Sequence, residues 1–100
     1  VMLTCKQSNH EGDLIDWIQE LEVDGIILNA GGYTHTSVAL RDAIEDSDIP
    51  VIEVHITDIY KREAFRQTSL LTDVCAHSII GIGTECYAKG VEWIINEKNK

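Results

Sequence analysis

The sequence predicts one α/β domain in which a parallel sheet is covered by helices on both faces. Apolar strand-like runs alternate with helix-like segments throughout the 100 residues. This alternation is typical of parallel strands joined by right-handed crossovers. The run over residues 25–28 is apolar at successive positions, as in a strand buried on both faces. No repeat, low-complexity segment or linker interrupts the order, so we expect a single domain over residues 1–100.

The first predicted strand covers residues 1–6. A helix is expected over residues 7–22, and Ser8 and Glu11 have the spacing of a capping box at its start. The apolar stripe of this helix consists of Leu14, Ile18 and Leu21.

After the second strand, a helix is expected over residues 36–48. Thr36 or Ser37 can cap its amino terminus, and Pro50 prevents its continuation. The third strand is predicted over residues 51–56. The apolar face of the helix consists of Leu40 and Ile44.

An irregular stretch over residues 57–72 precedes the fourth predicted strand, residues 77–83. Thr84 is expected to cap the last helix. The aligned apolar side chains of that helix are Tyr87, Val91, Ile94 and Ile95.

Composition and charge exclude several kinds of partner. The net charge of −9 argues against a nucleic-acid partner, since proteins that bind phosphate backbones usually carry a basic face. No apolar run approaches the ~18 residues of a membrane span, and no segment resembles a signal peptide. Any anionic ligand must therefore be held by local donors.

The cysteines and histidines indicate neither a disulfide framework nor a metal site. Cys5, Cys75 and Cys86 form no C-x-x-C pair, and their odd number fits reduced thiols in the cytoplasm. The four histidines lack the spacing of zinc ligands. We therefore expect a cytoplasmic protein without a bound metal.

Asn29 and His55 each stand at the end of a predicted strand. Ligands of parallel sheets bind beyond the carboxyl ends of the strands, so both side chains can reach one crevice. Glu53 precedes His55 by two residues and therefore points to the same face. A carboxylate there can hold one imidazole nitrogen and leave the other free for proton transfer.

The chain beyond His55 offers further groups that suit an anionic or polar ligand. The backbone amides of Ile56 and Thr57 leave the strand and can bind an anion. Arg62 and Arg66 lie on the only long predicted loop, where functional residues are commonly found.

Several residues near these strand ends also have a purely structural interpretation. Asn29 alone fits a turn cap slightly better than a ligand contact, and His35 alone fits an exposed helix start equally well. Gly31 and Gly32 indicate a positive φ or a close backbone approach. Tyr33 is interpreted as a packing residue.

Three segments together resemble the type II dehydroquinases (3-dehydroquinate dehydratases): QSNHEGDLIDWI, ILNAGGYTHTSVALRDAI and VIEVHITDIYKREAFR. The resemblance implies a flavodoxin-like, five-stranded parallel sheet and a homo-oligomer of twelve chains arranged as four trimers. It also implies dehydration of 3-dehydroquinate to 3-dehydroshikimate by anti elimination through an enolate, without metal or cofactor. The pathway would be that of shikimate, and so of aromatic amino acids, or that of quinate.

The resemblance also implies roles for individual residues. His55 would donate a proton to the departing hydroxyl, with Glu53 orienting its ring. Asp42 would reach the site of a neighbouring subunit. The other expected substrate contacts are Asn29, His35, the backbone amides of Ile56 and Thr57, and Arg66. The family commonly has Leu-Ser where this chain has Ile56-Thr57, a change that leaves the amides and a hydroxyl in place.

The resemblance further implies that the domain is truncated at its amino terminus. The family begins with another strand, a lid loop with an essential arginine and the tyrosine base, and a helix. That strand would lie inside the sheet, between residues 1–6 and 25–28. Two alternatives stay open at this point: a flavodoxin-like FMN-binding module, and an inactive structural subunit.

Overall fold

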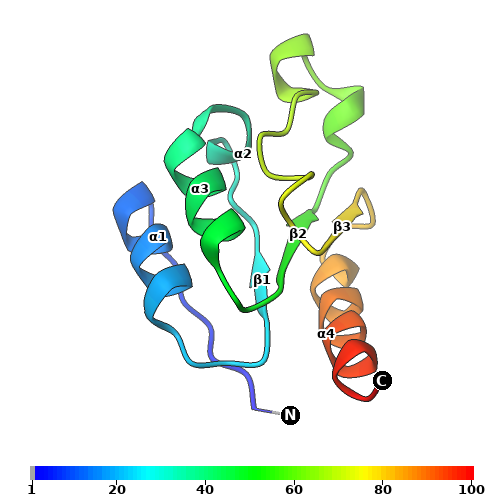
Figure 1. The fold of residues 1–100 in the computed structure, drawn as a ribbon. Helices are drawn as coiled ribbons and strands as arrows, with labels where there is room; N and C mark the ends of the chain where they lie inside the picture. Colours follow the sequence, from blue (N-terminus) through cyan, green and yellow to red (C-terminus); the bar gives the residue numbers. More distant parts are fainter. Residues whose placement is uncertain (1) are drawn as a thin grey trace.

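The computed structural model describes residues 2–100 and contains strands that alternate with helices (Figure 1). Two single 3₁₀ turns interrupt the long loop after the second strand. In chain order the elements are α1 (Glu11–Glu20), β1 (Ile26–Leu28), α2 (Tyr33–Thr36), α3 (Val38–Asp46), β2 (Val51–His55), η1 (Ile59–Lys61), η2 (Ala64–Arg66), β3 (His77–Ile80) and α4 (Glu85–Lys98).

The three strands form one parallel sheet in the order β1-β2-β3. Ile27 pairs with Ile52 of the central strand, and Val54 pairs with Ile79 on its other side. Helices α1 and α3 lie on one face of the sheet and α4 lies on the other (Figure 1). The predicted α/β architecture with helices on both faces is therefore confirmed.

Strand β2 separates two apolar clusters because its side chains alternate between the faces. Val51 packs with α1 and α3, whereas Ile52 and Val54 pack with α4. Every residue of β2 is buried. Since Glu53 and His55 follow the alternation set by Val51, both lie on the face that α3 and the long loop cover.

The predicted strand over residues 1–6 is wrong for residues 2–6, and Val1 lies outside the described residues. These residues pair with no strand in the described part of the chain. Together with β1 they border a cleft of about 1530 Å³. A strand conformation is stabilised by ladder hydrogen bonds, and residues 2–6 make none with the described strands.

The predicted capping box is also wrong, because α1 begins later than expected. His10 occupies the N-cap position without a side-chain capping bond. Ser8 instead accepts a hydrogen bond from the His10 amide at 3.0 Å and donates to Asp13 Oδ2 at 2.6 Å. Its hydroxyl thus stabilises the turn before the helix.

The helix predicted over residues 36–48 is divided at Ser37. The chain forms the short α2 and then α3, which Ser37 caps by accepting from the Leu40 amide at 2.9 Å. The strand predicted over residues 77–83 ends at Ile80, because the next residue, Gly81, has a φ of +84°. Thr84 occupies the N-cap position of α4 but makes no side-chain capping bond.

Candidate active site

A small recess of about 180 Å³ opens at the carboxyl ends of β1 and β2. The turn after β1, the end of β2 and the loop after β2 supply its walls. The recess is lined by Asn29, Gly31, Gly32, His35, His55, Ile56, Thr57, Ile59, Arg62 and Arg66. The structure thus brings together all the predicted site residues except Glu53 and Asp42.

The turn after β1 places Asn29 at the recess. Its Oδ1 accepts from the Gly31 amide at 3.2 Å, and its Nδ2 donates to the Tyr87 hydroxyl at 3.0 Å. Gly31 has a φ of +58°, a conformation that residues with a side chain rarely adopt. Asn29 therefore shapes this turn and lines the recess at once.

Helix α2 supplies His35 to the recess. Its Nδ1 lies 2.8 Å from the carbonyl oxygen of Thr68, so the ring joins α2 to the long loop. Tyr33, on the same helix, donates its hydroxyl to the carbonyl of Asn9 at 2.7 Å and does not line the recess. This geometry agrees with a packing role for Tyr33.

His55 and Glu53 form a buried pair at the inner wall of the recess. His55 Nε2 lies 2.8 Å from Glu53 Oε2, and the two residues are 5% and 1% exposed. With Nε2 engaged by the carboxylate, Nδ1 is the ring nitrogen left for a ligand. The predicted contact between Glu53 and His55 is therefore present.

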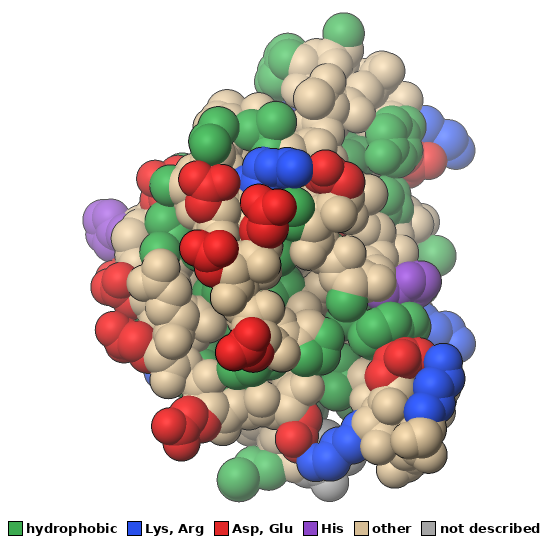
Figure 2. Space-filling model, viewed as in Figure 1, with side chains coloured by type: hydrophobic (Ala, Val, Ile, Leu, Met, Phe, Trp, Pro, Cys, Tyr) green, Lys and Arg blue, Asp and Glu red, His purple; other side chains and the backbone are tan. Residues whose placement is uncertain are grey.

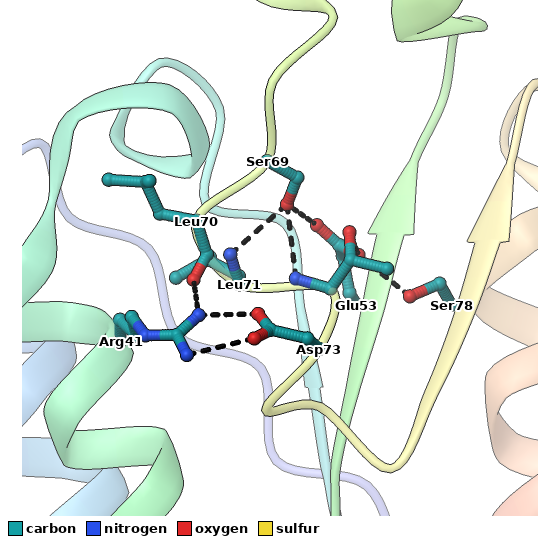
Figure 3. Close-up of polar contacts among 8 residues, drawn as sticks. Arg41, Glu53, Ser69, Leu70, Leu71, Asp73 and Ser78 are labelled. Carbon is teal, nitrogen blue, oxygen red and sulfur yellow. Dashed lines mark hydrogen bonds and ion pairs between the residues drawn. The ribbon is translucent and has the colours of Figure 1, made fainter.

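Hydroxyl groups surround the same carboxylate (Figure 3). Burial alone would raise the pKa of Glu53, but hydrogen bonds from His55, Ser78, Thr72 and Ser69 outweigh burial and lower it to about 2. Glu53 is thus an anion at neutral pH. The serine and threonine donors were missed from sequence. A glutamate on a buried strand indicates that its carboxylate needs hydrogen-bond donors, but the sequence does not indicate which loop residues supply them.

An ion pair holds the loop that carries two of these donors. Arg41 on α3 binds both carboxylate oxygens of Asp73 and donates to the Leu70 carbonyl at 2.8 Å (Figure 3). The Leu70 amide donates to the Thr34 carbonyl at 2.8 Å. The hydrogen bond from Arg41 lowers the pKa of Asp73. These contacts place Ser69 and Thr72 beside β2.

The recess gathers cationic side chains although the chain carries a net charge of −9. Figure 2 shows acidic side chains over the face formed by α1 and α3. In the recess, by contrast, Arg62 and Arg66 stand near two imidazoles. Arg66 Nε lies 2.7 Å from Glu63 Oε2, an ion pair in which the N–H does not point at the oxygen. Arginine, imidazole and backbone N–H groups gathered in one recess are donors that suit an anionic ligand.

Three further expectations concern Asp42, metal ligands and membrane spans. Asp42 is exposed on α3 and does not line the recess of its own chain. Among residues 2–100, no three acidic, histidine or cysteine side chains are grouped as metal ligands would be. Within the same range, no helix combines the length and hydropathy that crossing a bilayer requires.

Comparison with known proteins identifies the family. The model of the family described as "Dehydroquinase class II" matches residues 1–95. The chain belongs to this family. The chain is 55% identical over 97 residues to a 3-dehydroquinate dehydratase of Campylobacter jejuni, a match that covers 95% of the chain and 61% of that protein. It is 48% identical over 99 residues to a 3-dehydroquinate dehydratase of Bacillus pumilus, covering 97% and 67%.

A solved structure confirms the flavodoxin-like α/β fold of this chain. The crystal structure of a type II dehydroquinase from Butyrivibrio crossotus superposes with a TM-score of 0.89 at 44% identity. The match covers 92% of this chain and 66% of the other. The chain thus spans between 61% and 67% of the length of the relatives it matches.

Proposed function

We propose that the intact protein dehydrates 3-dehydroquinate to 3-dehydroshikimate. The observation that carries the proposal is the buried pair of His55 and Glu53 at the wall of a cationic recess. An acid held in this way meets the main chemical need of the reaction, because hydroxide is a poor leaving group unless it is protonated. At about 180 Å³ the recess is smaller than the ~300–1,000 Å³ usual for ligand pockets, so it suits only a small ligand.

In the proposed reaction, a base removes the proton α to the ketone and an enolate forms. The electron pair of the enolate then expels the β-hydroxyl on the opposite face of the ring. The imidazolium of His55 gives this hydroxyl the proton of Nδ1, so that it leaves as water and His55 is left neutral. The Glu53 carboxylate stays bound to His55 Nε2, the ring nitrogen that does not face the substrate, throughout the reaction. The base comes from outside the described residues in this proposal, and no metal or cofactor takes part.

The substrate carboxylate would bind to Asn29 and to the backbone amides of Ile56 and Thr57. His35 and Arg66 would bind ring hydroxyls. Their common position in the recess supports these roles, and fixed donors are what an acidic protein needs to hold an anion.

Asp42 would contribute to the site of a neighbouring subunit within trimers that assemble as a dodecamer. Its exposed position on α3, away from the recess of its own chain, supports a contact between subunits. We place the enzyme in the cytoplasm and in the shikimate pathway of aromatic amino acid biosynthesis, or in the breakdown of quinate.

We infer that the domain of the intact protein includes a further strand beside β1. One edge of β1 pairs with β2, and the other faces the cleft of about 1530 Å³ bordered by residues 2–9. Apolar side chains such as Ile26, Leu21 and Val91 line that cleft. An unpaired strand edge with an apolar lining is costly in water, and the greater length of the relatives supports a segment that fills it.

The proposal is tested by incubating the purified intact protein with 3-dehydroquinate and recording the ultraviolet absorbance of the conjugated enone product. Quinate, which lacks the ketone needed for an enolate, serves as the control compound. Enone formation from 3-dehydroquinate alone is expected. A visible flavin absorbance without enone formation would instead favour an FMN-binding module.

A further inference from the structure

The carboxylate of Glu53 has every acceptor position occupied. Oε1 accepts from Thr72 Oγ1 at 2.7 Å and from Ser78 Oγ at 2.7 Å. Oε2 accepts from Ser69 Oγ at 2.8 Å and lies 2.8 Å from His55 Nε2. A carboxylate offers about four such positions, so the three hydroxyls and the imidazole together complete its shell.

The direction of the Ser69 hydrogen bond is fixed by the backbone around it (Figure 3). Its oxygen accepts from the amides of Leu71 and Thr72, each at 3.1 Å. Both lone pairs are therefore used, and the hydroxyl hydrogen is left for Glu53. Oε2 must act as an acceptor toward Ser69. A proton on the Ser69 side of that oxygen would face the Ser69 hydrogen, so that position is closed to a proton.

Two other titratable side chains near Glu53, those of Cys75 and Asp73, take no hydrogen-bond position on its carboxylate. Burial raises the pKa of the Cys75 thiol to about 12, so the thiol stays neutral. Asp73 on the same loop is paired with Arg41 of α3. The remaining titratable neighbour is His55 on the same strand.

We propose that Ser69, Thr72 and Ser78 are positioning residues of the site. Their hydroxyls keep the Glu53 carboxylate ionised and immobile, and the carboxylate in turn accepts from the Nε2–H of His55, with Nδ1 turned to the ligand. Without a second proton the ring is then the Nε2–H tautomer. The proton that His55 gives to the departing hydroxyl is one that Nδ1 has taken up from solvent, and Glu53 stabilises the imidazolium so formed. The kinetic consequence of this proposal rests on the proposed dehydratase function. The predicted tautomer of His55 does not rest on that function, because it follows from the hydrogen bonds of the folded protein alone.

The test uses the intact protein with single substitutions of one hydroxyl donor. Thr72→Val removes the hydroxyl at nearly constant shape, and Thr72→Ser keeps it. Ser78→Ala removes the second donor to Oε1. Ser47→Ala is the matched control, because this part-buried hydroxyl also bridges a turn, at 3.1 and 3.2 Å from backbone atoms of Ile49, but lies at the end of α3.

Nitrogen-15 NMR of the His55 ring reports the tautomer directly, with His55→Ala used to assign the signals. The wild-type protein and the Thr72→Ser and Ser47→Ala variants should show the Nε2–H form. Thr72→Val and Ser78→Ala should show a mixture of both tautomers. Loss of one donor to a buried charge should also lower kcat about tenfold. KM should change little, since these hydroxyls do not line the recess.

The pH profile of kcat gives a second readout. Without Thr72 Oγ1 or Ser78 Oγ, the pKa of Glu53 should rise from about 2 toward its ordinary value of 4.5, so activity should be lost at a higher pH on the acid side. An unchanged His55 tautomer and pH profile in both Thr72→Val and Ser78→Ala would overturn the proposal. A tautomer that depends on these hydroxyls in a protein without dehydratase activity would overturn only the proposed function.

Discussion

The two hollows beside β1 differ in how completely the chain surrounds them. The recess at the carboxyl ends of the strands is small, and His55 in its wall is held from behind by the Glu53 carboxylate, whose hydrogen-bond donors are all in place. The cleft on the open edge of β1 is about 1530 Å³, and residues 2–9 border it without pairing with a strand. The comparison indicates that the groups proposed to donate the proton are complete within residues 2–100, whereas the sheet keeps an unpaired edge at β1 within the same residues.

The largest expected effect concerns the open cleft. Residues 1–100 expressed alone should be largely unfolded or aggregated, because net stability is only ~5–15 kcal/mol and an uncovered apolar strand edge removes a large share of it. Circular dichroism during urea unfolding should show no cooperative transition, and the fragment should not dehydrate 3-dehydroquinate.

The matching control adds the amino-terminal segment of the Campylobacter jejuni relative, in cis or as a separate peptide. Folding and activity should then return together. A cooperatively folding and active fragment without that segment would show that the cleft needs no further strand.

The next effect concerns the cationic side of the recess. Arg66→Ala in the intact protein should lower kcat/KM for 3-dehydroquinate roughly 10- to 100-fold, because it removes a charged donor from a polar ligand. Lys89→Ala is the control, since Lys89, like Arg66, forms an ion pair with a glutamate three residues away but lies on α4, outside the recess. Equal steady-state constants for the two variants would contradict the proposed contact.

The buried carboxylate should also contribute to stability in a pH-dependent way. Because the folded-state pKa of Glu53 lies below its ordinary value of 4.5, at about 2, the contribution is present above pH 4.5 and is lost as the pH falls toward 2. At pH 7 Glu53→Gln should lower the free energy of unfolding by roughly 3 kcal/mol.

Urea unfolding at pH 7 and at pH 3 measures this contribution. The difference between wild type and Glu53→Gln should shrink at the lower pH. Glu92→Gln, at an exposed ion pair on α4, should change the unfolding free energy by no more than ~0.5 kcal/mol at either pH. A Glu53→Gln effect independent of pH would mean that the ionised carboxylate is not what stabilises the fold here.

The smallest expected effect is a difference in stability between alanine substitutions at two neighbouring glycines at the edge of the recess. Gly31→Ala should cost about 1 kcal/mol, since φ at this position is +58°. Gly32→Ala should be close to neutral, because φ there is −62° and a Cβ would meet no atom within 4 Å. Thermal unfolding of both variants tests the comparison, and equal costs would argue against backbone strain at Gly31.

Much of the fold could be predicted because local pattern and tertiary structure agree in β1, β2 and α4. The period of two along β2 was enough to place Glu53 and His55 on one face, and their position at strand ends was enough to bring Asn29 to the same recess. These inferences depend only on the geometry of strands, which irregular loops do not disturb.

Other parts of the structure could not be predicted because a partner distant in the sequence decides them. Residues 2–6 have a strand-like pattern but no neighbouring strand in the described chain. Ser69 and Thr72 approach Glu53 only because the loop is tied to α3 through Arg41 and Asp73. No periodicity encodes such a loop path, so these donors could not be found from sequence.

The most direct test of the central claim is the turnover of intact His55→Ala compared with the intact wild-type protein. We expect the wild-type protein to convert 3-dehydroquinate to 3-dehydroshikimate. We expect the variant, with an unchanged fold by circular dichroism, to be slower by about 10²–10⁴-fold, the usual contribution of a positioned acid. Near-normal turnover in a folded His55→Ala variant would contradict the assignment of His55 as the proton donor.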